Sequence, residues 1–165
     1  MRASKKDVTF QGNACRVGRL DPLSALRIIA LLQSAQLAAF RKFAPSRANG
    51  NEPAKAETPT VSQVEEMIAM GWALASSELS EEQLIGVQHK CLVSCEAKSV
   101  KSNMYERVIA DDGRWVQEEV SDNLQLVNFL VVETLKYNLT SFFLDGASEP
   151  VKAGTHASAP SAPRT

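Results

Sequence analysis

The residues of this chain that could carry chemistry are three cysteines and two histidines. His89, Cys91 and Cys95 fall close together, and Cys15 could be a distant fourth ligand. Thiolate and imidazole ligands bind zinc in a tetrahedron, usually from turns that space them two to four residues apart. On a helix, however, Cys91 and Cys95 share a face and His89 points elsewhere. Because free cysteine is often buried, we predict core thiols and no metal.

The same side chains offer little for nucleophilic or acid–base catalysis. A catalytic base must be held within hydrogen-bond reach of its nucleophile. His156 lies in a segment with the composition of a disordered tail, and His89 has no marked carboxylate partner. The paired carboxylates at 111–112 and 118–119 fit an acidic turn and strand positions that face opposite ways. The sequence has no glycine-rich phosphate loop, and it therefore predicts no enzyme, no catalytic residue and no cofactor.

Length and composition limit what can position these residues. The chain has 165 residues, of which 44% are apolar and 22% charged, enough for one ordinary core but short for two full domains. A formal charge of −1 argues against nucleic acid as a partner. The opening MRASKKDVTF lacks the apolar run of a secretory signal, and the longest apolar runs are too short for a membrane span. We predict a cytoplasmic protein that does not bind membranes.

The N-terminal part contains signals for a hairpin, a long helix and a linker. Two β-prone runs within residues 7–17 flank Gly12-Asn13, a dipeptide that tolerates the positive φ angles of a tight turn. Asp21-Pro22 can start a helix that runs to about Ala44, and its apolar positions cover more than one stripe, which predicts packing on two sides. Residues 45–60 hold three prolines and no large core residue, so we predict a flexible insertion.

Two helices and a second hairpin are predicted next. Apolar residues at spacings of three and four, from Val61 through Trp72, predict a helix with Trp72 in the core. The SEEQ sequence at 80–83 is a capping box for another helix that runs to about Cys91. Between 93 and 120 the pattern becomes strand-like, and Asp112-Gly113 lies between YERVIA and RWVQEE as a hairpin turn should.

The last predicted helix begins after a cap at Asp122 or Ser121 and ends at Gly146. Its VNFLVV run alone could equally be a buried strand, but the length of the segment favours a helix. Residues 147–165 have the composition of a disordered tail. We therefore predict an α+β fold, a predominantly helical single domain over residues 1–146 with two small β-hairpins.

Two adjacent phenylalanines, Phe142 and Phe143, stand near the end of that helix. Adjacent helix positions are about 100° apart, so one side of the helix cannot fully bury both. Aromatic residues are ordinary core anchors, but they are also enriched at the centres of protein interfaces. We predict that one of the two packs beneath a neighbouring element or a partner.

Two segments of the chain resemble parts of one family of proteins. The first is residues 10–28, FQGNACRVGRLDPLSALRI, which is similar to the short hairpin, R/K-I/V-G-K/R-L run and long helix that open these proteins. The second is residues 116–146, VQEEVSDNLQLVNFLVVETLKYNLTSFFLDG. It resembles a hairpin strand and a C-terminal helix that ends in an asparagine-leucine pair and two phenylalanines, here Asn138, Leu139, Phe142 and Phe143. The capped helix near residue 80 also fits. Together these segments resemble the tail assembly chaperones of long-tailed bacteriophages.

The resemblance implies a non-enzymatic assembly factor of the host bacterial cytoplasm. Such proteins bind the tape measure protein, a long helical chain with exposed apolar stripes, until tail tube protein polymerises around it. They leave before the virion is complete. A helical client needs an apolar groove, so we expect Leu139, Phe142 and Phe143 to close the core and to border the surface for the client or for self-association.

Two other classes of protein stay open at this point. A small metal-binding regulatory protein would use Cys15, His89, Cys91 and Cys95, and zinc would be essential to its folding. A structural tail component would remain in the virion, from which a chaperone should be absent.

Overall fold

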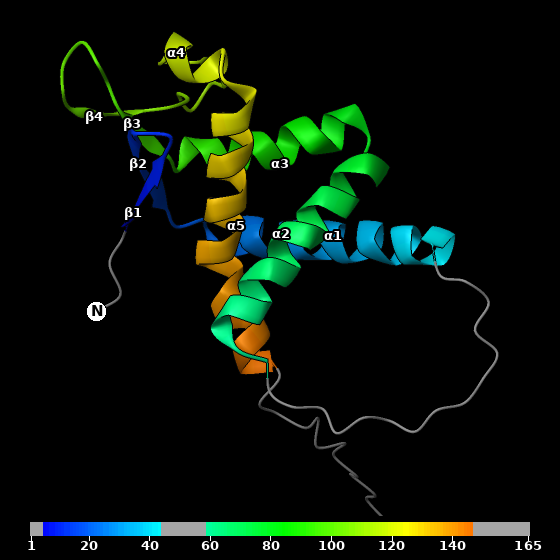
Figure 1. The fold of residues 1–165 in the computed structure, drawn as a ribbon. Helices are drawn as coiled ribbons and strands as arrows, with labels where there is room; N and C mark the ends of the chain where they lie inside the picture. The colour runs from blue at the N-terminus through cyan, green and yellow to red at the C-terminus, as the bar shows by residue number, and fades with distance from the viewer. Residues whose placement is uncertain (1–4, 44–58, 147–165) are drawn as a thin grey trace, which may run out of the picture.

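The computed structural model describes residues 5–43 and 59–146. Its elements in chain order are β1 (Lys5–Phe10), β2 (Asn13–Gly18), α1 (Pro22–Phe43), α2 (Val61–Glu78), α3 (Glu81–Val93), β3 (Glu96–Lys98), β4 (Tyr105–Arg107), α4 (Glu118–Ser121) and α5 (Leu124–Gly146). The last helix, α5, is central: α1, α2 and α3 all contact it, and the sheet lies beside its N-terminal half (Figure 1). The predicted α+β class, mostly helical with two small hairpins, is confirmed.

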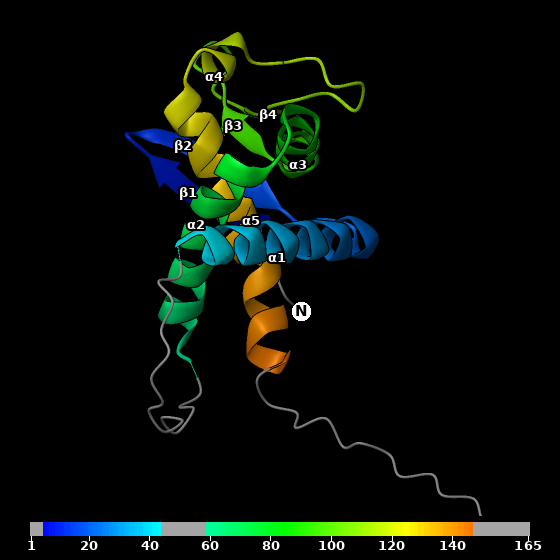
Figure 2. The same cartoon turned by 90° about the vertical axis from the view of Figure 1, so that its right-hand side faces the viewer.

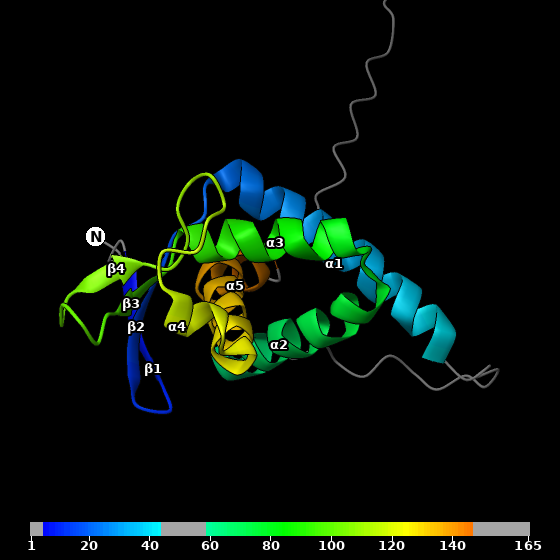
Figure 3. The same ribbon diagram turned by 90° about the horizontal axis from the view of Figure 1, so that it is seen from above.

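The two hairpins join into one antiparallel sheet with strand order β1-β2-β3-β4. Strand β2 makes the junction by pairing with β3, where Arg16 lies opposite Glu96. Seen from above, the sheet occupies one side of α5, while α2 and α3 lie on its other sides (Figure 3). The sequence predicted each hairpin separately and did not predict that they share a sheet.

The first hairpin is confirmed, but its turn lies one residue earlier than we predicted. Gln11 and Gly12 form the turn with φ angles of 48° and 85°, and Asn13 is already paired with Phe10. A two-residue turn of this kind needs positive φ at both central positions. Gly12 adopts this conformation without steric cost, whereas Asn13 has a place in the ladder of β2.

The second hairpin also forms, but not around Asp112-Gly113. Strand β3 pairs with β4 across residues 99–104. Gly113, with φ 86°, makes a separate tight turn that brings residues 108–110 against residues 114–116. Their pairing is limited to an isolated bridge between Ile109 and Trp115 and to backbone hydrogen bonds on either side of it. RWVQEE forms no strand of the sheet: after Val116 the Gln117 side chain turns inward and donates to the carbonyl oxygens of Ala97 and Glu106 at 2.8 and 3.0 Å. The acidic pair at 118–119 therefore belongs to the first turn of α4 and not to a strand.

Helix caps agree with the sequence at two of three predicted sites. The Asp21 carboxylate accepts from the Ser24 backbone N–H at 2.8 Å, and Ser80 forms the predicted capping box with Gln83. The cap of α5 is Asn123, whose side-chain oxygen accepts from the Leu126 N–H at 3.0 Å, so the prediction of Asp122 or Ser121 was wrong. Asp122 instead ends α4.

The proline-rich insertion and the tail fall almost wholly outside the described residues. Of the segment at 45–60, only the last two residues are described, and Thr60 forms a capping box with Gln63 at the start of α2. The sequence did not predict this second capping box, because Thr60 was placed in the linker. The tail at 147–165 lies outside the described residues altogether.

The core is built around α5, in which Leu130, Val131 and Leu135 are fully buried. Trp72 is buried as predicted, and its indole N–H donates to the Asn128 side chain at 3.0 Å, which fixes α2 against α5. Helix α1 runs across α2 and α5 and not along them (Figure 2). Among its described side chains only one face is buried, whereas Leu23 and Leu26 are more than half exposed. The prediction that α1 packs on two sides was therefore wrong for this part of the helix.

Candidate functional site

An apolar pocket of about 70 Å³ lies where α1, α2 and α5 meet. Leu139 and Phe143 are four residues apart on α5 and therefore lie on one face of that helix. Helices α1 and α2 supply the rest of the lining, which consists of Ile29, Leu32, Gln33, Val64, Met67 and Ile68. Most of these side chains belong to the core, but Met67 is 61% exposed. The pocket is thus an opening in the surface of the core and can receive an apolar side chain from outside.

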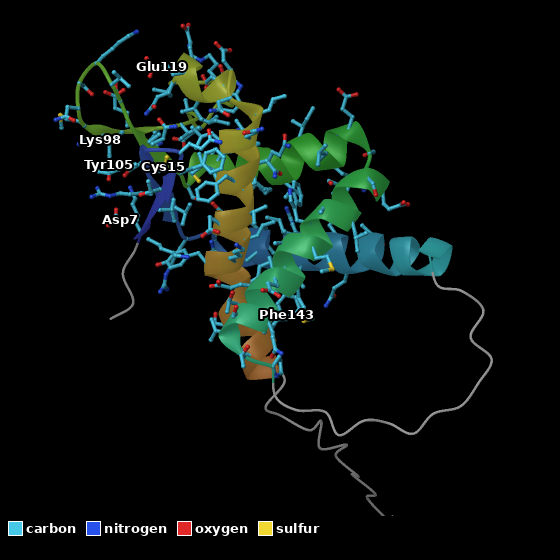
Figure 4. All side chains as sticks on the ribbon, in the orientation of Figure 1. Asp7, Cys15, Lys98, Tyr105, Glu119 and Phe143 are labelled. Carbon is cyan, nitrogen blue, oxygen red and sulfur yellow. The ribbon has the colours of Figure 1, made fainter. Side chains whose placement is uncertain are left out.

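The two phenylalanines have different surroundings. Phe143 packs against the core and lines the pocket, near the end of α5 where α2 passes beside it (Figure 4). Phe142 is 45% exposed, and its ring meets that of Phe143 edge to face, with the centroids 5.4 Å apart. One phenylalanine therefore packs inward and the other extends the apolar surface beside the pocket. Leu139 itself is 1% exposed.

Asn138 holds α5 against the segment that joins β2 to α1. Its side-chain oxygen accepts from the Leu20 N–H at 2.9 Å, and its amide group donates to the Gly18 carbonyl at 3.1 Å. A third bond from the same amide, to the Thr134 carbonyl at 2.8 Å, fixes the side chain on its own helix. The asparagine of the asparagine-leucine pair thus positions α5, and the leucine beside it forms part of the pocket.

A close backbone contact explains why the run from Arg16 to Leu20 has a glycine, Gly18, at its centre. A Cβ atom at this position would come 2.5 Å from the Ser94 carbonyl oxygen, because the end of β2 passes directly against the end of α3. Only glycine permits that approach without a shift of the backbone. The two segments that resemble the chaperone family are therefore in direct contact through Gly18, Leu20 and Asn138.

The three cysteines are buried in the core. Cys95 Sγ lies 3.2 Å from the Thr134 hydroxyl and 3.3 Å from the Cys91 carbonyl oxygen. Burial raises the pKa of Cys95 to about 11, and it raises the pKa of Cys91 further, with the neighbouring Cys95 adding to the shift. No three His, Cys, Asp or Glu side chains in the described ranges come together as a metal site would require.

Because the thiols are buried, we expect no thiol to react with a disulfide reagent at about pH 8 in the native state, and all three to react in denaturant.

The free energy of unfolding should depend on pH because the same thiols are buried. Folding favours the protonated thiols, so their contribution is complete below the unfolded pKa of 9.0 and is lost as pH rises towards 11 and beyond. Reagent titration and urea unfolding across this pH range test the prediction. Rapid labelling of a native thiol would contradict the buried arrangement.

The remaining candidates for chemistry lie at the surface or outside the described residues. His89 faces the tight turn at Gly113, where a Cβ would lie 3.3 Å from its Nε2. The Asp112 carboxylate accepts from the backbone and side chain of Arg114, at 3.1 and 2.6 Å, and these bonds hold the pKa of Asp112 below its usual value. His156 lies in the undescribed tail.

Sequence reasoning identified the α5 part of the pocket but missed its other walls. Val64 and Ile68 were predicted only as part of a buried stripe, and Met67 and Gln33 were not singled out. The available signal was the i, i+3 spacing of Val64 and Met67. It could not have shown that Met67 is exposed, because that depends on where α1 crosses α2.

Comparisons with known proteins agree with this arrangement of segments. A family model described as phage tail assembly chaperone protein, TAC, matches residues 11–150, which is most of the chain. No curated protein and no solved structure matches. Among the described helices, none is long and apolar enough to cross a membrane.

Proposed function

Because this chain belongs to the phage tail assembly chaperone family, we propose that it binds the tape measure protein and helps to recruit the tail tube protein during tail assembly. It performs this role in the host cytoplasm and is absent from the mature virion. The role needs no catalytic residue and no cofactor, since its task is to cover apolar surface of the client until the tube forms.

The observation that carries the proposal is the pocket between α1, α2 and α5. A helix that docks in a groove places apolar anchors at spacings of three and four residues into pockets of its partner. Leu139 and Phe143 form the α5 wall of such a pocket, and Met67 borders it from α2. Methionine suits a surface that accepts varied apolar side chains, because its unbranched chain adapts to their shapes. Phe142 enlarges the apolar surface at one side.

A large side chain at the rim should block the pocket without disturbing the core. Gln33 is exposed and lines the pocket, so Gln33→Trp places an indole over the opening. Co-expression with the tape measure protein of the same genome, followed by a pull-down, should show about a ten-fold loss of bound client, as expected when one buried anchor is excluded. The matched control is Ser34→Trp, since Ser34 is exposed, adjacent on α1 and not part of the lining.

Equal retention of the tape measure protein by both tryptophan variants would exclude the pocket as its binding site. Failure of the unmodified chain to retain or solubilise the tape measure protein would remove the client assignment itself. Recruitment of tube protein is measured separately, by adding tube protein to the preformed complex. Mass spectrometry of purified virions tests the last part of the proposal, because a structural tail component would be found there and a chaperone would not.

A further inference from the structure

Strand β1 forms an open edge of the sheet on the side away from β2. The pair Phe10 and Asn13 closes a two-residue turn and is therefore a hydrogen-bonded pair. Bonded and non-bonded pairs alternate along the ladder, so the backbone groups of Lys5, Asp7 and Thr9 point away from β2. No described strand pairs with that side. The edge thus offers a row of backbone donors and acceptors six residues long.

The opposite edge of the sheet is less available. Strand β4 has only three residues, and the chain that follows it is covered by residues 114–116. There the Ala110 N–H donates to the Arg114 carbonyl at 2.9 Å, and the Val116 N–H donates to the Val108 carbonyl at 3.0 Å. A strand from another protein would therefore add to β1 more readily than to β4.

A groove of about 570 Å³ adjoins β1 on the face of the sheet that is turned towards α5. It includes Lys6 and continues along α5 past Lys136 and Thr140 to Leu144. The side chain of Lys6 lies on this face, since its amine is 3.2 Å from the Glu133 carboxylate of α5. A residue placed opposite Lys6 on an added strand would have its side chain on the same face, next to Lys6. Lys6 is the residue of β1 that lines the groove, so such a side chain would lie at the border of the groove.

The charges in and beside the groove favour an acidic side chain. Three cations, Lys6, Arg19 and Lys136, line it together with one carboxylate, Glu65. Glu133 is shared by Lys6 and Lys136, at 3.2 and 2.9 Å. Arg19 has no ion-pair partner in the described part of the chain. The three cations therefore face two carboxylates, and one positive charge is left over.

We propose that β1 accepts an extended strand from a partner protein, with an acidic residue of that strand beside Lys6 and an apolar residue two positions away beside Val8, which packs against the core on the same face. This surface is separate from the pocket lined by Leu139 and Phe143. Main-chain hydrogen bonds to Lys5, Asp7 and Thr9 supply the attachment, and the groove selects the side chains.

The charged residues of β1 do not by themselves close this edge. Lysines on an edge strand often prevent pairing with other chains. Here Lys5 pairs with Glu96 and Asp7 with Arg16, whereas Lys6 shares the single carboxylate of Glu133 with Lys136. The side chains of the odd-numbered residues lie on the far face of the sheet, where Figure 4 shows Asp7 beside the strand. They leave the backbone edge itself uncovered.

A peptide selection tests the proposal on the full chain. A random decapeptide library displayed on its messenger RNA is selected for binding, and the affinity of the enriched peptides is measured by fluorescence anisotropy. We expect Asp or Glu two positions from an apolar residue. Thr9→Pro should weaken binding about ten-fold or more, because it removes an outward N–H. Thr9→Ala, which keeps that N–H, should bind as the unmodified chain does.

A second pair of variants tests the groove. Lys6→Gln should weaken the same peptides roughly five-fold, the value of a partly exposed ion pair, while Lys98→Gln on β3 should have no effect. If Thr9→Pro does not fold, peptides N-methylated at alternate positions test the ladder without a change to the chain. Lack of enriched acidic peptides, or equal binding by Thr9→Pro, would overturn the proposal. Concentration-dependent dimerisation that Thr9→Pro abolishes would also overturn it, since a second copy would then occupy the edge.

Discussion

Replacement of Leu139 by alanine is expected to lower the free energy of unfolding by about 2–5 kcal/mol, the usual cost of truncating a fully buried leucine. Leu139 is 1% exposed and stands where α1, α2 and α5 meet. The loss combines the transfer free energy of the removed methyl groups with an enlarged cavity. Urea unfolding followed by circular dichroism measures the change. The slope of free energy against urea should stay the same, because the unfolded surface hardly changes.

The alanine substitution of Phe142 should lower the free energy of unfolding much less than that of Leu139. Phe142→Ala removes a ring that is 45% exposed and that contacts Phe143 only edge to face. We expect a stability loss of less than about 1.5 kcal/mol, the upper value of such an aromatic contact. Its effect should instead appear in client binding. A further control is Leu124→Ala at the start of α5, where the side chain is 79% exposed and far from the pocket in the sequence of the helix.

Comparable stability losses in Leu139→Ala and Phe142→Ala would mean that both side chains are core residues. The proposed division between a buried wall and an exposed border would then be wrong. If Phe142→Ala instead retains stability and loses the tape measure protein, the paired phenylalanines have separate tasks. Phe143 then maintains the pocket and Phe142 meets the client, as their different exposures suggest.

Local chemistry explains which elements the sequence could predict. Asp21, Ser80 and Gly12 act within three or four residues of themselves, so their cap and turn signals are visible in the chain. Elements cannot be predicted in this way where a local signal fits more than one structure. Asp112-Gly113 has the composition of a hairpin turn and does make a tight turn, but the pairing behind it ends at Val116, and the next residue, Gln117, turns inward. Nothing in the local pattern indicates that this glutamine bonds to β3 and β4.

Long-range contacts account for the rest of the difference between prediction and structure. The joining of the hairpins depends on Arg16 lying opposite Glu96, at a separation of 80 residues in the chain (96 − 16). Leu139 and Phe143 could be predicted as site residues because they belong to the motif by which the end of α5 resembles the chaperone family. Gln33 and Met67 complete that site from α1 and α2, whose crossing no periodicity specifies. The binding role of Leu139, Phe142 and Phe143 stays a prediction.

The second large effect is expected at Gly18, where alanine should lower the free energy of unfolding by about 1–3 kcal/mol, as overpacking in a tight site does. The added methyl group would meet the Ser94 carbonyl oxygen at 2.5 Å. This is a backbone atom at the end of α3, so it cannot move aside as a flexible side chain would. The control is Gly86→Ala in α3, because a Cβ there meets nothing within 4 Å. Removing an exposed helical glycine should raise stability by about 0.5–1 kcal/mol.

The opposite signs of the two glycine changes would separate packing from recognition in the run from Arg16 to Leu20. A loss at Gly18 means that the glycine is needed for the close approach of β2 to α3, and that Asn138 then fixes the next turn of the chain through Gly18 and Leu20. In that case the run positions α5 and its pocket, and it need not touch a client. If Gly18→Ala unfolds like the unmodified chain but fails to retain the tape measure protein, the end of β2 is itself part of the binding surface, and the pocket between α1, α2 and α5 is not the whole site.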